Sequence, residues 1–170
     1  MHTIHRMAVA AALVLATALV AQAQQPPAGA TGTLMTPVGT WKTIDDKTGE
    51  AKSLVQISEV NGQLEGKVVK VLKSKQGPHP ICDKCDGARH NQPVVGMTIL
   101  WGMQQDGNEW DGGQILDPKT GKIYKCSMHV IDGGKKLSVR GYIGFSLFGR
   151  TQVWLRESTH VAPASSAATE

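Results

Sequence analysis

The sequence predicts an all-β protein, an up-and-down antiparallel barrel of eight strands, and three observations support this fold class. Between residues 36 and 157 no segment keeps the apolar spacing of a helix over the roughly 11–18 residues that such a prediction needs. Short strand-like segments recur there instead, separated by tight-turn signals such as Asn61-Gly62. Strands joined mainly by hairpins form a meander, which removes its free edges by closing into a barrel.

The expected strands follow one another with a turn signal after almost every one. Asn-Gly, Asp-Gly-Asn and Gly-Gly turns occupy 61–62, 106–108 and 133–134. Two further turns, 45–49 and 117–121, share the pattern D-x-K-T-G, in which Asp orders the turn and Gly supplies a positive φ. The eight expected strands span 39–44, 53–60, 64–72, 97–104, 109–116, 122–131, 136–143 and 149–156.

Three short segments flank the expected barrel. Residues 1–23 carry a positively charged start, an apolar run at 7–20 and the small-x-small site Ala21-Gln22-Ala23, which together indicate a secretory signal peptide. The apolar run is shorter than the roughly 20 residues of a membrane span, so we expect export without a membrane anchor. The destination would be the periplasm if the source has an outer membrane, and otherwise the extracellular space. Residues 24–35 and 158–170 are predicted to be a disordered linker and tail, which leaves a barrel domain at 36–157.

Composition and motifs narrow the function classes. The chain has 170 residues, which fits one domain, and a formal charge of +4 from 18 Lys and Arg against 14 Asp and Glu. Its basic residues are scattered along the chain, so no nucleic-acid partner is expected. The common motifs of nucleotide-binding proteins, zinc peptidases and serine hydrolases are missing, so we predict neither an enzyme nor a cofactor. The sequence leaves the oligomeric state open.

A series of short motifs resembles one protein family over about residues 37–157. Gly39-Thr40-Trp41 opens the first expected strand, and the other motifs follow in order: Cys82-Asp83-Lys84-Cys85, Pro93-Val94-Val95-Gly96, Trp110-Asp111-Gly112-Gly113, Asp117-Pro118 with Gly121-Lys122 and Tyr124, Arg140-Gly141-Tyr142-Ile143-Gly144, and Gly149-Arg150-Thr151 with Trp154 and Arg156. The series is similar to the family of small exported bacterial proteins of unknown function with a lipocalin-like (calycin-type) β-barrel. The resemblance implies export and a barrel, but no established activity or ligand.

The same resemblance assigns structural roles to two residues. It implies that Trp41 lies across the closed end of the barrel and stacks beneath an arginine of the last strand. An arginine suits this position because a guanidinium stacks well on an indole ring. Arg156 is the preferred partner and Arg150 the alternative.

The cysteines allow several hypotheses. In an exported protein, a disulfide between Cys82 and Cys85 that stiffens the irregular stretch 77–90 is the preferred one. A metal site formed by His79, Cys82, Cys85 and His90 is the alternative, since two thiolates and two imidazoles suit tetrahedral zinc or copper. Thiol redox chemistry is a third hypothesis, although such a motif normally opens a helix and none is expected here. Cys126 is predicted to be a buried thiol, with pairing between chains as its alternative.

The last two expected strands suggest a ligand site. Arg140, Tyr142 and Trp154, with Arg150 and Arg156 nearby, could line a pocket for an anion or a fatty-acid carboxylate. The alternative is structural, with Arg140 a solvated strand residue and Arg156 a seal at the barrel end. We therefore expect an exported barrel that binds a small apolar or amphipathic ligand as a carrier or sensor. An envelope metal-binding or thiol redox protein and a filled-barrel scaffold are the alternative functions.

Overall fold

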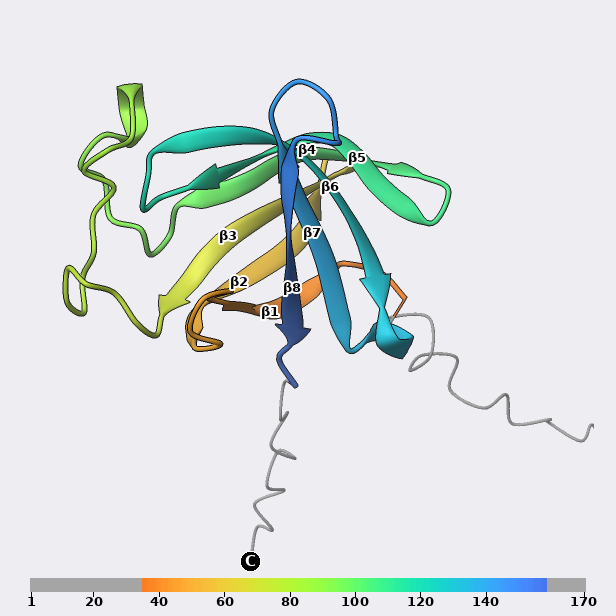
Figure 1. Ribbon diagram of the computed structural model, residues 1–170, viewed down its shortest axis with the longest axis horizontal. Coiled ribbons are helices and arrows are strands. Elements are labelled where there is room, and N and C mark those ends of the chain that lie inside the picture. The colour runs from red at the N-terminus through yellow and green to blue at the C-terminus, as the bar shows by residue number, and fades with distance from the viewer. Residues whose placement is uncertain (1–34, 159–170) are drawn as a thin grey trace, which may run out of the picture.

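Eight antiparallel strands form one closed sheet in the computed structural model, which describes residues 35–158 (Figure 1). Each strand pairs with the next along the chain, and β1 closes the barrel on β8 through the pairs Trp41–Arg156 and Lys42–Leu155. The predicted fold class is therefore confirmed. The predicted signal peptide and most of the predicted linker and tail lie outside the described residues. The strands are β1 (Gly39–Ile44), β2 (Ala51–Val60), β3 (Gln63–Val71), β4 (Thr98–Asp106), β5 (Glu109–Asp117), β6 (Lys122–Ile131), β7 (Lys136–Tyr142) and β8 (Gly149–Arg156).

Turn chemistry explains where the strands end. Asn61 and Gly62, between β2 and β3, both have a positive φ, as the expected two-residue hairpin requires. In the turn from β1 to β2, Asp45 accepts bonds from the backbone N–H groups of Lys47 and Thr48, at 2.9 and 3.2 Å. The pKa of Asp45 is lowered to about 2, mainly by the bond from the Lys47 backbone, with smaller effects from the Lys52 side chain and the Thr48 backbone. The only helical segments among residues 35–158 are two three-residue 3₁₀ turns, η1 (Gly87–Arg89) and η2 (Asp132–Gly134).

Side chains fill the middle of the barrel. Gly113 on β5 leaves room for the Met103 side chain, because a Cβ at this position would lie 2.2 Å from the Met103 sulfur. Met103 and its neighbours are inaccessible to solvent or nearly so, and they close the middle of the barrel to a ligand. The largest buried side chains are those of Trp41, Val55, Ile57, Val68, Leu100, Met103, Met128, Leu137 and Trp154.

Residues 35–38, which we call the crossing segment, pass over the barrel end at which β1 begins and β8 finishes. The Trp41 indole N–H donates to the carbonyl of Pro37 at 2.6 Å. The Arg156 guanidinium lies over the Trp41 ring, 4.1 Å from its centre. It also donates to the carbonyls of Thr36, Val38 and Gly134, at 2.7, 3.0 and 2.6 Å. These contacts join the crossing segment and the β6–β7 turn to the seam between β1 and β8.

Candidate functional site

The three residues expected to line one ligand pocket lie on opposite faces of the sheet. Trp154 points inward, since it is 2% exposed and pairs with the fully buried Leu137 of β7. Arg140 and Tyr142 stand at outward positions of β7, and both line a hollow on the outer face. Successive side chains of a strand alternate between its faces, so the outer residues of β7 cannot join Trp154 across the sheet. The structure therefore does not bring Arg140, Tyr142 and Trp154 together.

Arg140 and Tyr142 hold the surface around the connection from β7 to β8. The Arg140 guanidinium donates to the carbonyl of Ser146 from Nε at 2.9 Å and to the hydroxyl of Thr151 from Nη1 at 2.9 Å. The third nitrogen, Nη2, donates to the carbonyls of Ser146 and Leu147. Tyr142 donates its hydroxyl to Asp111 at 3.3 Å, and burial, followed by the charge of Asp111, raises the pKa of Tyr142. Most of the N–H groups of the Arg140 guanidinium therefore donate to other groups of the protein rather than to a ligand.

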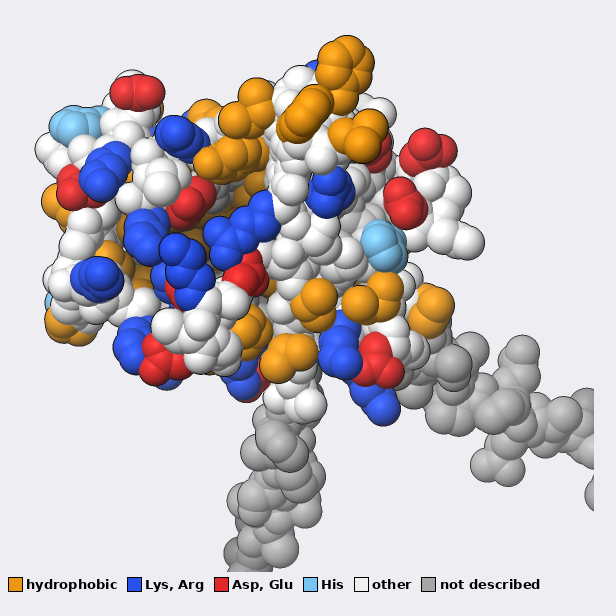
Figure 2. All heavy atoms as spheres, viewed as in Figure 1, with side chains coloured by type: hydrophobic (Ala, Val, Ile, Leu, Met, Phe, Trp, Pro, Cys, Tyr) orange, Lys and Arg blue, Asp and Glu red, His pale blue; other side chains and the backbone are white. Residues whose placement is uncertain are grey.

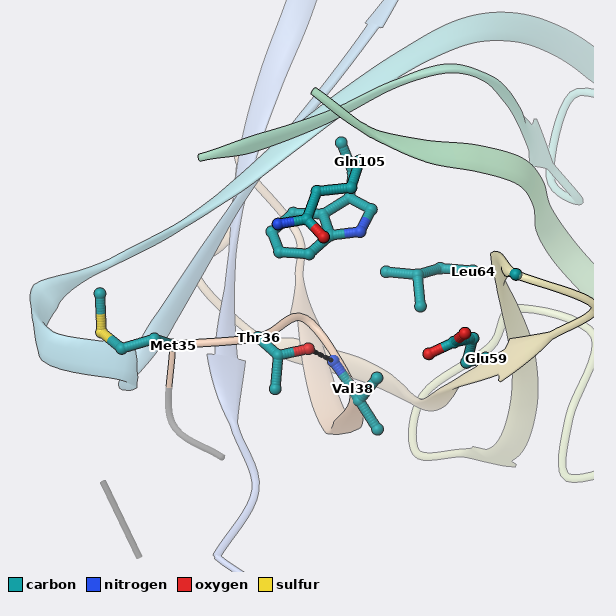
Figure 3. A pocket seen from close by; sticks show the side chains of 8 residues that line it. Met35, Thr36, Val38, Glu59, Leu64 and Gln105 are labelled. Atoms are coloured by element: carbon teal, nitrogen blue, oxygen red, sulfur yellow. Dashed lines mark hydrogen bonds between the residues drawn. The ribbon is translucent and has the colours of Figure 1, made fainter. Parts of the chain in front are cut away.

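A different hollow lies inside the barrel end that the crossing segment covers. Glu59 pairs with Leu64 across the β2–β3 hairpin, and Gln105 pairs with Trp110 across the β4–β5 hairpin. Leu64 is 4% exposed and also pairs with the fully buried Met103, so these positions face the interior. Figure 3 shows Leu64, Glu59 and Val38 around a common space with Gln105 on its other side. We call this space the end hollow; its volume is about 290 Å³, and it is lined by Met35, Thr36, Val38, Glu59, Gly62, Leu64, Gln105 and Trp110.

The end hollow combines an apolar wall with one acidic group. Val38, Leu64 and Trp110 supply apolar surface, and Glu59 and Gln105 supply polar atoms. None of its eight lining residues is Lys or Arg. The hollow therefore favours a ligand that presents apolar surface together with a cationic or hydrogen-bond-donating group, the opposite polarity to the carboxylate expected from the sequence.

Sequence reasoning missed Glu59, Gln105 and Trp110. A usable signal was present, because the Asn61-Gly62 turn fixes the hairpin register and places Glu59 beside Leu64. What the sequence could not supply is the crossing segment, which completes the hollow from a part of the chain distant from both hairpins.

Arg156 takes the stacking position over Trp41, and Arg150 does not. Arg150 forms an ion pair with Asp46 of the β1–β2 turn, and its own side chain is 61% exposed. The amide of Gln152, also on β8, donates to the same Asp46 carboxylate at 3.4 Å. These contacts tie the β1–β2 turn to the start of β8 at the barrel end opposite the crossing segment.

Cys82 and Cys85 form a disulfide in the long connection from β3 to β4. Both residues are buried, and the Cys82 sulfur lies 3.3 Å from the carbonyl oxygen of Pro118 in the β5–β6 turn. Gly121, in the same turn, is so close to the backbone of Lys84 that a Cβ would lie 1.8 Å from that carbonyl oxygen. The disulfide therefore stiffens a connection that packs tightly against the barrel.

The alternative metal ligands do not converge in the described part of the chain. The disulfide uses both sulfurs, and His90 Nδ1 lies 2.9 Å from the backbone carbonyl oxygen of Cys85. Among residues 35–158, no group of three or more His, Cys, Asp or Glu side chains is arranged to hold a metal ion, so His79, Cys82, Cys85 and His90 form no such group. The buried disulfide also offers no accessible thiolate for redox exchange.

Cys126 is a free thiol in the barrel core. It occupies an inward position of β6 and is fully buried, and burial raises its pKa to about 12. A neutral thiol in this position acts as a small apolar side chain.

A closed eight-stranded meander in which an arginine of the last strand stacks on a tryptophan of the first defines a lipocalin-like barrel. In agreement, the chain resembles a solved structure described as protein HP1028 from the human pathogen Helicobacter pylori, which belongs to the lipocalin family. The TM-score is 0.64 at 19% sequence identity, over 74% of this chain and 85% of that one.

Residues 39–156 match the model of the family described as uncharacterized protein conserved in bacteria (DUF2147), and the chain belongs to this family. No curated protein matches the sequence. Within residues 35–158, no helix has the length and apolar character needed to cross a membrane.

Proposed function

We propose that this chain is an exported barrel protein that binds a small, partly apolar ligand in the end hollow, as a carrier or sensor without catalysis. The observation that carries the proposal is the placement of Leu64, Trp110 and Glu59 around one interior space under the crossing segment. Its volume of about 290 Å³ is near the lower limit of typical ligand pockets, roughly 300–1,000 Å³. A ligand of this size would have few heavy atoms.

The lining supports a ligand with an amine or another donor group. Glu59 is the one acidic residue among those that line the end hollow, and the amide of Gln105 can donate or accept. A primary ammonium would meet the Glu59 carboxylate and lie near the Trp110 ring, which attracts cations over its face. A carboxylate in the same space would be repelled by Glu59.

A filled-barrel scaffold is the second candidate function. The buried Trp154 and Met103 favour it, because they leave no room for a ligand in the middle of the barrel. The two functions differ in what the end hollow does. A carrier or sensor takes a ligand there, whereas a scaffold leaves the hollow to solvent.

The test compares three probes that share one alkyl chain: hexylamine, 1-hexanol and hexanoate. Titration into the ¹⁵N-labelled protein should shift the amide signals of the crossing segment, Glu59, Leu64 and Trp110 most strongly with hexylamine. Glu59 is exposed, so the charge preference should be modest, roughly fivefold in affinity between hexylamine and 1-hexanol.

Two variants separate the hollow's carboxylate from a general charge effect. Glu59→Gln should remove the preference for hexylamine over 1-hexanol. Glu65→Gln makes the same charge change on β3, at a position that does not line the hollow, and should keep that preference. Absence of binding by all three probes would favour the scaffold, and signal shifts confined to another surface would overturn the proposed site.

A further inference from the structure

The connection from β7 to β8 exposes a dense group of apolar side chains. Its sequence from residue 143 to 148 is Ile-Gly-Phe-Ser-Leu-Phe. Ile143, Phe145, Leu147 and Phe148 are 64%, 78%, 86% and 77% exposed, more than any other large apolar residue in the described chain. Figure 2 shows apolar side chains gathered where Figure 1 places this connection, at the top of the barrel. We call these six residues the apolar loop.

The apolar loop turns its backbone inward and its side chains outward. Arg140 donates to the carbonyls of Ser146 and Leu147, and the backbone N–H groups of Ile143 and Phe148 donate to the carbonyls of Phe148 and Phe145. Exposed polar backbone is the main obstacle to entering an apolar phase, because each unsatisfied group costs several kcal/mol. These bonds remove part of that obstacle.

Basic side chains surround the base of the apolar loop. Arg140 lies directly beneath it, and Arg150 is the second residue of the strand that leaves it. Lys125 on β6 is exposed and pairs in register with Tyr142, the last residue of β7. Lys122 is also exposed, at the same end of β6. Asp46 forms its ion pair with Arg150 of this group, and Asp111 accepts from Tyr142, so the positive charge at the base of the loop comes mainly from Arg140, Lys122 and Lys125.

The area of the apolar loop is too small for a stable contact between two folded proteins. A specific interface buries roughly 800 Å² on each partner, whereas four apolar side chains of about 150 Å² each fall short of that area. A lipid surface needs no matching shape, and it accepts a protruding group of Phe, Leu and Ile side chains flanked by Lys and Arg. We propose that the apolar loop inserts into the surface of a membrane that contains anionic phospholipid, with the basic residues at its base against the headgroups.

Vesicle sedimentation tests the proposal on the mature chain, from residue 24 onward. Vesicles of phosphatidylcholine with phosphatidylglycerol should retain the protein, pure phosphatidylcholine should retain less, and added salt should weaken the binding. The triple variant Phe145→Ser, Leu147→Ser, Phe148→Ser should bind the anionic vesicles at least roughly tenfold more weakly, since it removes most of the inserted surface. These positions are exposed, so the variant should retain the circular dichroism spectrum of the parent.

A matched control removes apolar surface elsewhere. Val60→Ser with Val69→Ser alters two exposed valines on β2 and β3, at 39% and 45% exposure, and should leave vesicle binding unchanged. Failure of the parent protein to bind anionic vesicles would overturn the proposal. Equal binding by parent and triple variant would also overturn it, as would a triple variant that changes only the oligomeric state in gel filtration.

Discussion

Replacing Arg156 with alanine should be among the most destabilising single changes at the seam of the barrel. The guanidinium makes three hydrogen bonds to backbone carbonyls and stacks on Trp41 at 4.1 Å. Hydrogen bonds to a charged group contribute about 1.5–3 kcal/mol each, and an arginine over an indole adds about 0.5–2 kcal/mol. The lower end of each range suits a partly exposed group, so we expect a loss of about 5 kcal/mol in the free energy of unfolding.

Urea unfolding, followed by circular dichroism and tryptophan fluorescence, measures this loss. Arg156→Lys should recover less than half of it, because one ammonium cannot reach three carbonyls that lie around a planar fork. Arg150→Ala is the matched control, since Arg150 lies near the start of the same strand, is exposed and forms an ion pair with Asp46 at the surface. It should cost less than about 1 kcal/mol. A cost for Arg156→Ala no larger than that of Arg150→Ala would refute the assignment of Arg156 as the residue that joins the crossing segment to the seam.

Two further predictions concern the disulfide connection and the buried thiol. Gly121→Ala should lower the free energy of unfolding by about 2–3 kcal/mol and open the β3–β4 connection to proteases, because the new Cβ collides with Lys84. Gly49→Ala is the control: Gly49 has a similar φ, a Cβ there would have nothing within 4 Å, and the loss should be only about 1 kcal/mol. Equal costs would contradict the tight contact. The Cys126 thiol has a pKa of about 12 in the folded protein, against an ordinary value of 9.0, so between pH 8 and 10.5 it ionises only in the unfolded chain. Over this range the free energy of unfolding of the parent should therefore fall by about 2 kcal/mol more than that of Cys126→Ala. Urea titrations at both pH values measure the difference, and parallel losses would show that Cys126 is not the cause.

Local signals in the sequence were sufficient to predict the strands. The Asn61-Gly62 turn and the D-x-K-T-G turns each specify a reversal by themselves, and the strands between them start and end within two residues of the predicted bounds. The closure of the barrel followed from the same meander, with Trp41 beside Arg156 at the seam. These features depend on residues close in the chain or on a single pairing between the chain's two ends.

The candidate site could not be predicted in the same way. Arg140 and Trp154 can be assigned to opposite faces of the sheet only if the interior face of β8 is known. The sequence does not identify that face, because Trp154 shares it with Arg150 and Arg156. The apolar loop was partly hidden as well, because Ile143 continues the alternation of β7 and was expected to end that strand. Both features depend on how the strands curl, which short-range periodicity does not record.

The polarity of the end hollow follows from how Arg156 is used. Its guanidinium lies close to the crossing segment, and a free positive charge there would attract an anionic ligand. The carbonyls of Thr36, Val38 and Gly134 and the Trp41 ring hold the guanidinium outside the hollow, where it keeps its charge, so Arg156 builds the wall of the hollow without lining it. Glu59 then remains as the one ionisable side chain that lines the hollow. The crossing segment that completes the hollow and the closure of the barrel consequently depend on one residue, and Arg156→Ala should weaken hexylamine binding under conditions where the barrel is still folded, because the segment loses the contacts that hold it over the hollow.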